Sequence, residues 1–169
     1  MSIFNRPYTI GDLMNIDFGR QERASGCSVE LVKIYHQIKP EALIDKFKNF
    51  FTYNRTHLKA YFLILKLKVV SGTGNTHIVF IKINPDFNLN RWESNRVKIY
   101  CDCADFKYRS AYILNDRHSL FLTDRIKLSL GSSLTDKPKA TAKTSLLCKH
   151  AFAAIQWLIN NYANLMRTI

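Results

Sequence analysis

Residues 59–71, KAYFLILKLKVVS, decide the fold that this sequence predicts. Leucine or valine occupies every second position from Leu63 to Val69, and lysines stand at positions 66 and 68 between them. This period of two gives the segment one apolar face along its length, as in a strand buried on one side. The turn-forming residues GTGN follow at 72–75, and a second apolar run then returns at His77–Ile83. Together the two runs predict an antiparallel hairpin.

Shorter apolar patterns on both sides of the hairpin predict the remaining elements. Alternating residues indicate strands at Ser28–Gln37 and Arg96–Tyr100. Apolar residues three and four apart indicate helices at 10–16, 40–51, 105–114, 123–130 and from Cys148 onward. Thr123 is placed to cap its helix, and Gly131 to end it. Because the helices do not alternate with the strands, we expect an α+β fold, with an antiparallel β-sheet and C-terminal helices packed on it.

The length of 169 residues suits one domain with a core of its own. Hydrophobic residues make up 47% of the chain, which is enough apolar surface to offset the entropy lost on folding. Residues 1–26 are polar and rich in turn formers, so we expect an irregular N-terminal arm interrupted only by the short helix. Residues 27–169 are expected to form the single α+β domain, with a loop at 132–145.

The chain carries a large excess of positive charge, with 25 lysines and arginines against 13 acidic residues. A net charge of +12 attracts polyanions such as nucleic acid, anionic lipid or an acidic protein surface. The cations are scattered along the chain, so the alternative is a solvated basic surface without a dedicated partner. Neither a membrane-length apolar run nor the apolar core of a secretory signal is present. We therefore expect synthesis in the cytoplasm and no membrane association.

Three of the four cysteines fall into two short pairs with a histidine. Cys101-x-Cys103 ends a predicted strand, and Cys148-x-His150 opens the last predicted helix. In a chain without a secretory signal, such clusters indicate a metal site before a disulfide. The strand spacing brings both thiolates of the first pair to one side, and the helix dipole favours the thiolate of the second. The alternative is a set of core cysteines, which is what we expect for the isolated Cys27.

Three thiolates and one imidazole form a closed tetrahedral set, the usual environment of a structural zinc ion. We therefore expect Zn²⁺ at Cys101, Cys103, Cys148 and His150, with no open position for a reactive water. The other histidines are expected at the surface or in satisfied polar contacts: His36, His57, His77 and His118. No phosphate-binding loop, dinucleotide-binding motif or nucleophile elbow occurs. We expect neither an enzyme nor a small-molecule substrate.

The segment Val97–Arg109, VKIYCDCADFKYR, together with Leu147–Ala151, LCKHA, resembles the SWIM-type zinc finger. That family has Cys-x-Cys, a variable gap, and Cys-x-His at the start of a helix. The likeness spans about 97–154 and is similar to small SWIM-like proteins of tailed, crAss-like bacteriophages, whose genes lie among virion structural genes. Residues 104–147 form a longer gap than in most cellular SWIM fingers, which weakens the transfer of the family's DNA-binding role.

The resemblance implies a non-enzymatic, zinc-stabilised structural or assembly protein of a tailed-phage virion. A ring, connector or adaptor at the portal–tail region is the expected role, with portal, ring or tail proteins as partners and the virion as its location. The alternative is a basic nucleic-acid-binding accessory protein, cytoplasmic outside a particle, with DNA as a further partner. Lys107, Arg109 and Lys149 are the expected contacts to nucleic acid or to a partner protein. Phe106, Tyr108 and Tyr112 alternate with these cations and could stack on bases, but at helical spacing we expect them to be core residues.

Overall fold

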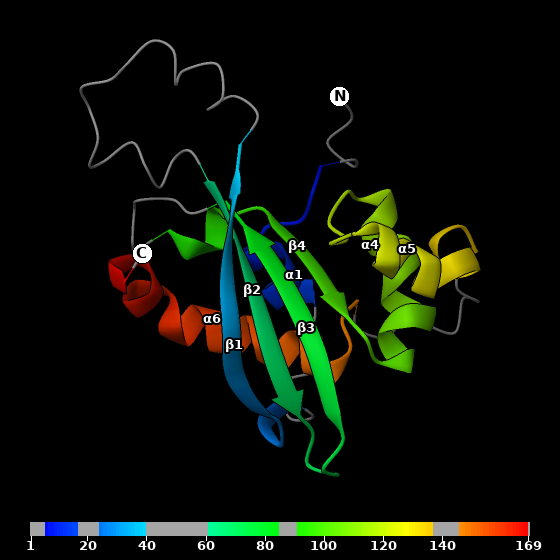
Figure 1. The fold of residues 1–169 in the computed structure, drawn as a ribbon, viewed down its shortest axis with the longest axis horizontal. Helices are drawn as coiled ribbons and strands as arrows, with labels where there is room; N and C mark the ends of the chain where they lie inside the picture. The colour runs from blue at the N-terminus through cyan, green and yellow to red at the C-terminus, as the bar shows by residue number, and fades with distance from the viewer. Residues whose placement is uncertain (1–5, 17–23, 40–60, 85–90, 137–145, 169) are drawn as a thin grey trace.

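The computed structural model describes residues 6–16, 24–39, 61–84, 91–136 and 146–168. Its centre is an antiparallel sheet in the order β1-β2-β3-β4, with neighbours in the chain side by side (Figure 1). The strands are β1 Ser28–Ile38, β2 Tyr61–Val70, β3 Thr76–Ile83 and β4 Val97–Cys101. Helices pack on this sheet, so the α+β fold is confirmed. The helix predicted at 40–51 lies outside the described residues.

The β2–β3 hairpin forms as the sequence predicts. Its turn is closed by the Gly74 N–H, which donates to the Ser71 carbonyl at 2.8 Å. Gly74 has φ of +85°, a left-handed conformation that favours glycine. Leu65 pairs with Ile81 and Leu67 with Val79, and all four side chains are fully buried. One face of the hairpin therefore forms one side of the hydrophobic core.

Strand β1 departs from simple alternation. Leu31 pairs with Leu67, but the next pair joins Lys33 to Lys66, so Val32 is an extra residue in a β-bulge. The bulge leaves Val32 48% exposed. It also shifts the phase of the strand, so that the partly buried residues Val29, Leu31 and Ile34 lie on the inner face. The predicted strand is correct, but a strict period of two does not hold through it.

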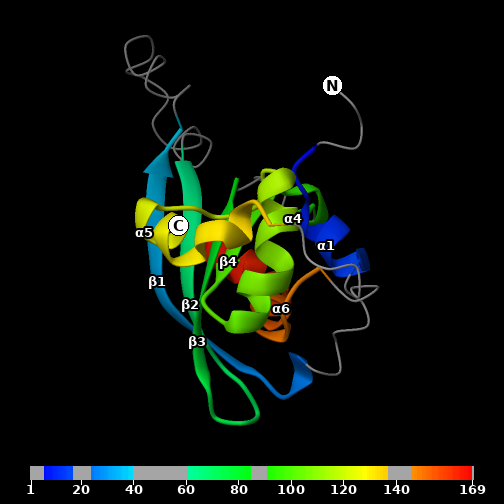
Figure 2. The same ribbon diagram turned by 90° about the vertical axis from the view of Figure 1, so that its right-hand side faces the viewer.

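Helices cover the two faces of the sheet unequally. On the inner face, α6 (Lys149–Thr168) crosses and contacts all four strands (Figure 1). On the opposite side lies α5 (Asp124–Leu130) (Figure 2). Thr123 Oγ1 accepts the N–H of Ile126 at 3.2 Å and Gly131 ends the helix, as predicted. Between β4 and α5, a π-helical segment η5 (Phe106–Ser110) continues into α4 (Ala111–Asp116). Short 3-10 turns are η4 (Trp92–Ser94) and η6 (Gly131–Leu134).

The predicted short helix is present as α1, Ile10–Ile16. Its Ile10 and Leu13 side chains are fully buried in the same core as the sheet. The Ile10 N–H donates to the Asn95 carbonyl, and the Asn95 side chain donates to the Tyr162 hydroxyl of α6 at 2.9 Å. The described part of the expected arm is therefore packed on the domain, although the boundary at residue 26 stays a prediction. Among the described helices, none has the length and apolar character needed to cross a membrane.

Candidate metal centre

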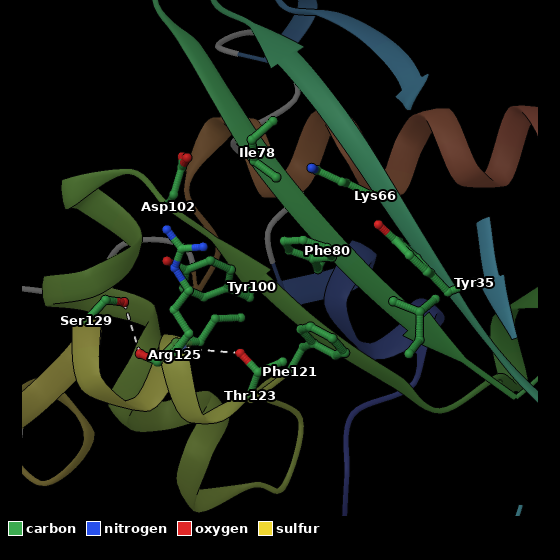
Figure 3. A pocket seen from close by; sticks show the side chains of 12 residues that line it. Tyr35, Lys66, Ile78, Phe80, Tyr100, Asp102, Phe121, Thr123, Arg125 and Ser129 are labelled. Atoms are coloured by element: carbon green, nitrogen blue, oxygen red, sulfur yellow. Dashed lines mark hydrogen bonds between the residues drawn. The ribbon is translucent and has the colours of Figure 1, made fainter. Parts of the chain in front are cut away.

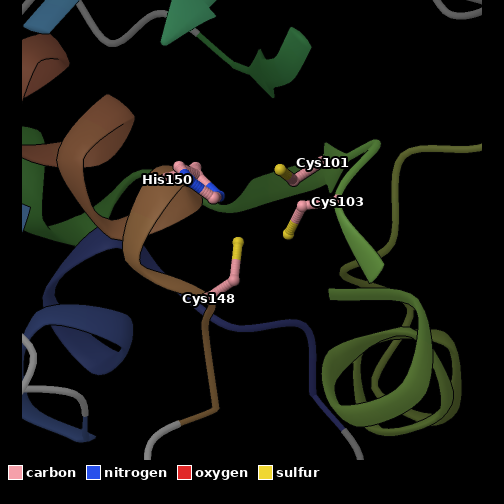
Figure 4. Close-up of side chains that lie close together, drawn as sticks. All are labelled: Cys101, Cys103, Cys148 and His150. Atoms are coloured by element: carbon pink, nitrogen blue, oxygen red, sulfur yellow. The ribbon is translucent and has the colours of Figure 1, made fainter. Parts of the chain in front are cut away.

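The structure brings together all four predicted ligands, although up to 49 positions separate them in the chain. Cys101 ends β4, Cys103 lies in the following bend, and Cys148 and His150 stand at the start of α6. Their sulfur and ring nitrogen atoms all lie within 4.8 Å of one another, and each residue is buried. Figure 4 shows the four side chains converging on one point. This convergence is the geometry of a four-ligand metal site.

Two helix starts direct backbone N–H groups at the cluster. The Phe106 N–H donates to Cys103 Sγ at 3.3 Å, three residues along a helix that begins after the bend. The Ala151 N–H donates to Cys148 Sγ at the same distance. Each cysteine thus takes the position of a helix N-cap, where free N–H groups and the helix dipole stabilise negative charge. The Sγ atoms of Cys103 and Cys148 therefore lie where the thiolate form is favoured.

Hydrogen bonds and burial shift the pKa values of the three thiols in opposite directions. Hydrogen bonds from Cys101 and Cys148 stabilise the thiolate of Cys103 and hold its pKa well below the ordinary value. Because Cys101 donates to Cys103 and Cys148, the pKa of Cys101 is raised. Burial is the main reason why the pKa of Cys148 is raised as well. A divalent cation held by Cys101, Cys103 and Cys148 would displace the remaining thiol protons, so that all three would bind it as thiolates.

His150 provides the clearest sign that the cluster is built for an ion. Its side chain is buried, with 6% exposure, and neither ring nitrogen has a hydrogen-bond partner in the described part of the chain. A buried polar atom without a partner is costly and uncommon in folded proteins. Coordination by one ring nitrogen removes that cost on one side of the ring. The residues therefore fit a metal ion.

His77 supports this histidine, a role that the sequence interpretation missed. Its ring lies against the His150 ring, with 4.2 Å between centroids. Its Nδ1 lies 3.0 Å from a carboxylate oxygen of Asp102, the residue between the two cysteines. His77 pairs with Val69 on the inner face of the hairpin, beside the end of β4. The sequence did hold one signal of this role: His77 falls at an inward-facing position of a predicted strand.

The three basic residues predicted as contacts lie beside the centre, and each is partly exposed. Lys107 and Arg109 are on η5, where Arg109 pairs with Asp105, and Lys149 lies between two of the ligands. Tyr108, one of the residues with a core interpretation, is 70% exposed because it lies two residues after the buried Phe106, on the opposite side of the helical turn. Cys27 is half-buried and lies outside the cluster.

The described residues define a class of site, a buried Cys₃His centre positioned to bind a metal ion. The chain itself matches no protein-family model, no curated protein and no solved structure. The chemistry of the donor set and its place in the fold therefore carry the functional interpretation.

Proposed function

We propose that the centre holds one structural Zn²⁺ ion and that the protein is a non-enzymatic binding or assembly module. The observation that supports this is the closed set of three sulfurs and one imidazole, all buried. Cys₃His is a common donor set for structural zinc, and soft thiolates disfavour Mg²⁺ and Ca²⁺. A fourth protein ligand fills the position that water occupies in catalytic zinc sites.

The ion would act as a clasp between two distant parts of the chain. It joins the end of β4 to the start of α6, across 44 intervening residues (104–147). Because α6 contacts all four strands on the inner face of the sheet, holding its first turn in place would hold the helix against the core. Binding free energy at such a site is folding free energy, since the unfolded chain has no preformed site.

We further propose that this clasped domain belongs to the SWIM-type proteins and serves in the assembly of a tailed-phage virion. The supporting observations are the Cys-x-Cys and Cys-x-His pairs with their flanking residues, and the absence of a recognisable catalytic motif. A ring, connector or adaptor at the portal–tail region remains the proposed role. Mass spectrometry of purified virions is expected to find the chain in several copies per particle. Its absence from particles that contain portal and tail proteins would refute the virion role while leaving the zinc clasp untouched.

A basic nucleic-acid-binding accessory protein is the second candidate function. The observation that favours it is the net charge of +12, part of which lies beside the centre at Lys107, Arg109 and Lys149. Phosphate contacts release counterions, so such binding weakens steeply as salt increases. Affinity for DNA that does not change with salt would exclude this function.

Replacing His77 with alanine is expected to weaken zinc binding by roughly tenfold, the lower end of the effect of residues that orient metal ligands. The reason is that the His77 ring, held by Asp102, fixes the orientation of His150. Competition with a chromophoric chelator measures the affinity. The control is His36→Ala, because His36 lies on β1 outside the cluster. Equal affinities for the wild-type protein and the His77 variant would show that stacking does not orient the ligand.

A further inference from the structure

The face of the sheet opposite α6 carries lysines and aromatic residues in two cross-strand rows. Strand pairing places one row across all four strands as Lys33, Lys66, Phe80 and Tyr100. The neighbouring row runs as Tyr35, Ile64, Lys82 and Lys98. Each row thus combines two cations with apolar or aromatic side chains. Such a surface differs from an ordinary solvated face, where charges of both signs alternate.

Both rows place two positive charges directly opposite each other. Lys33 is the cross-strand partner of Lys66, and Lys82 is the partner of Lys98. Like charges in such positions repel and weaken a sheet. Burial, together with the charge of Lys98, lowers the pKa of Lys82. Within the described part of the sheet, Glu30 and Asp102 are acidic residues at one end of this face, where Glu30 contacts Lys68 and Asp102 contacts His77. An anion on this face relieves the repulsion.

A cavity of about 610 Å³ opens between these rows and α5. Phe80, Ile64 and Ile78 of the sheet line one side, and Phe121 and Ile126 line the other. Lys66 and Arg125 enter the cavity from opposite sides, as Figure 3 shows. Its wall is therefore largely apolar, and its charged lining residues are Lys66, Arg125 and one carboxylate, Asp102. This combination accommodates a flat apolar group that carries a negative charge nearby.

The aromatic rings of this surface differ in their exposure. Tyr35 is 38% exposed at the margin of the cavity. Phe80 stacks on Phe121 with 5.4 Å between ring centroids and 17° between planes, so its position is fixed. Exposed rings beside cations are the combination with which proteins bind unpaired bases, because the ring stacks on the base and the cation contacts the phosphate.

We propose that this outer sheet face binds single-stranded nucleic acid, with bases against Tyr35 and the cavity wall and phosphates along the paired lysines. Duplex nucleic acid is disfavoured because its bases are stacked internally and cannot reach the aromatic residues. The proposal rests on the second candidate function and gives it a surface and a substrate class. The surface is separate from Lys107, Arg109 and Lys149, and it does not depend on the virion role.

Two matched variants distinguish a defined binding site from nonspecific attraction by the overall positive charge. The first replaces the sheet-face residues Lys66, Lys82 and Lys98 with glutamine, and the second replaces Lys107, Arg109 and Lys149 with glutamine. Both remove three positive charges from the zinc-loaded protein. The probe is a short fluorescein-labelled oligothymidylate, followed by anisotropy over a range of salt concentrations, with a duplex of equal length for comparison. Melting temperatures establish that each variant is folded.

The sheet-face variant is expected to bind the single strand roughly tenfold or more weakly, with a salt slope about 2 lower, because three phosphate contacts are lost. Tyr35→Ala is expected to weaken binding about fivefold or more without changing the salt slope, because it removes stacking only. The second triple variant should bind nearly as well as the wild type.

Four results would overturn the proposal. Equal losses in both triple variants would indicate a diffuse field, and a loss confined to the second would place nucleic acid at the metal centre, which keeps the second candidate function. Tighter binding of the duplex than of the single strand would exclude the substrate class. Failure of the wild-type protein to bind either probe would remove the second candidate function together with this inference.

Discussion

Replacing Cys148 with serine is expected to abolish stoichiometric zinc binding and to lower the melting temperature by about 10 °C. Cys148 is fully buried and supplies one of three sulfurs within 4.8 Å of the other ligand atoms. Free zinc at a thousand times its dissociation constant contributes about 4 kcal/mol to the free energy of unfolding. For a domain of this size, each kcal/mol corresponds to about 2–4 °C. Thermal unfolding under reducing conditions, with metal content measured after dialysis, tests the expectation.

Cys27→Ser is the matched control for this experiment. It makes the same chemical change at the remaining cysteine, which is half-buried and outside the cluster. We expect this variant to keep one zinc ion per chain and a nearly unchanged melting temperature. A strong chelator should lower the melting temperature of the wild type and of Cys27→Ser, and have little effect on Cys148→Ser. Equal stability of all three proteins, with and without chelator, would contradict the clasp.

Replacing Phe152 with alanine is expected to lower the free energy of unfolding by about 3–5 kcal/mol while zinc stays bound. Phe152 lies on α6 one turn after Cys148, is 1% exposed and belongs to the core beneath the sheet. Its truncation leaves a cavity between helix and sheet, whereas all four ligands remain in place. Chemical denaturation of the zinc-loaded protein, combined with metal analysis, gives both quantities.

Tyr108→Ala is the control for this truncation, since it also removes an aromatic ring. Tyr108 is 70% exposed, so its loss should change the free energy of unfolding by no more than about 0.5 kcal/mol. If Phe152→Ala is as stable as Tyr108→Ala, α6 is not packed on the sheet as described. If Phe152→Ala loses its zinc, the centre depends on core packing as well as on its ligands.

The elements that local chemistry determines could be predicted from the sequence. The hairpin follows from the alternation at 63–69 and the turn at Gly74, whose positive φ needs no tertiary contact. The cap at Thr123 follows from a single hydroxyl before a helix. The four ligands come together because each pair is local and stands at the end of a regular element. Only the contact between the Cys101–Cys103 pair and the Cys148–His150 pair had to be assumed, because it joins distant parts of the chain.

The features that were missed depend on contacts between distant segments. Nothing in the residues 28–38 marks Val32 as a bulge, because the bulge is set by register against β2. The outward position of Tyr108 depends on which side of its helical segment packs on the core, and that side carries Phe106, two residues earlier. The cationic rows could not be assembled before strand order and register were known. The role of His77 was partly predictable: its inward position followed from the strand pattern, but its contact with His150 did not.

Metal analysis of the freshly purified protein tests the zinc clasp most directly. Native mass spectrometry, together with elemental analysis under reducing conditions, determines both the identity of the ion and its ratio to the chain. One zinc ion per chain, released by chelation or by unfolding and absent from Cys148→Ser, is the expected result. A chain that is free of metal, does not take up added Zn²⁺ and melts at the same temperature with or without chelator would contradict the proposed centre.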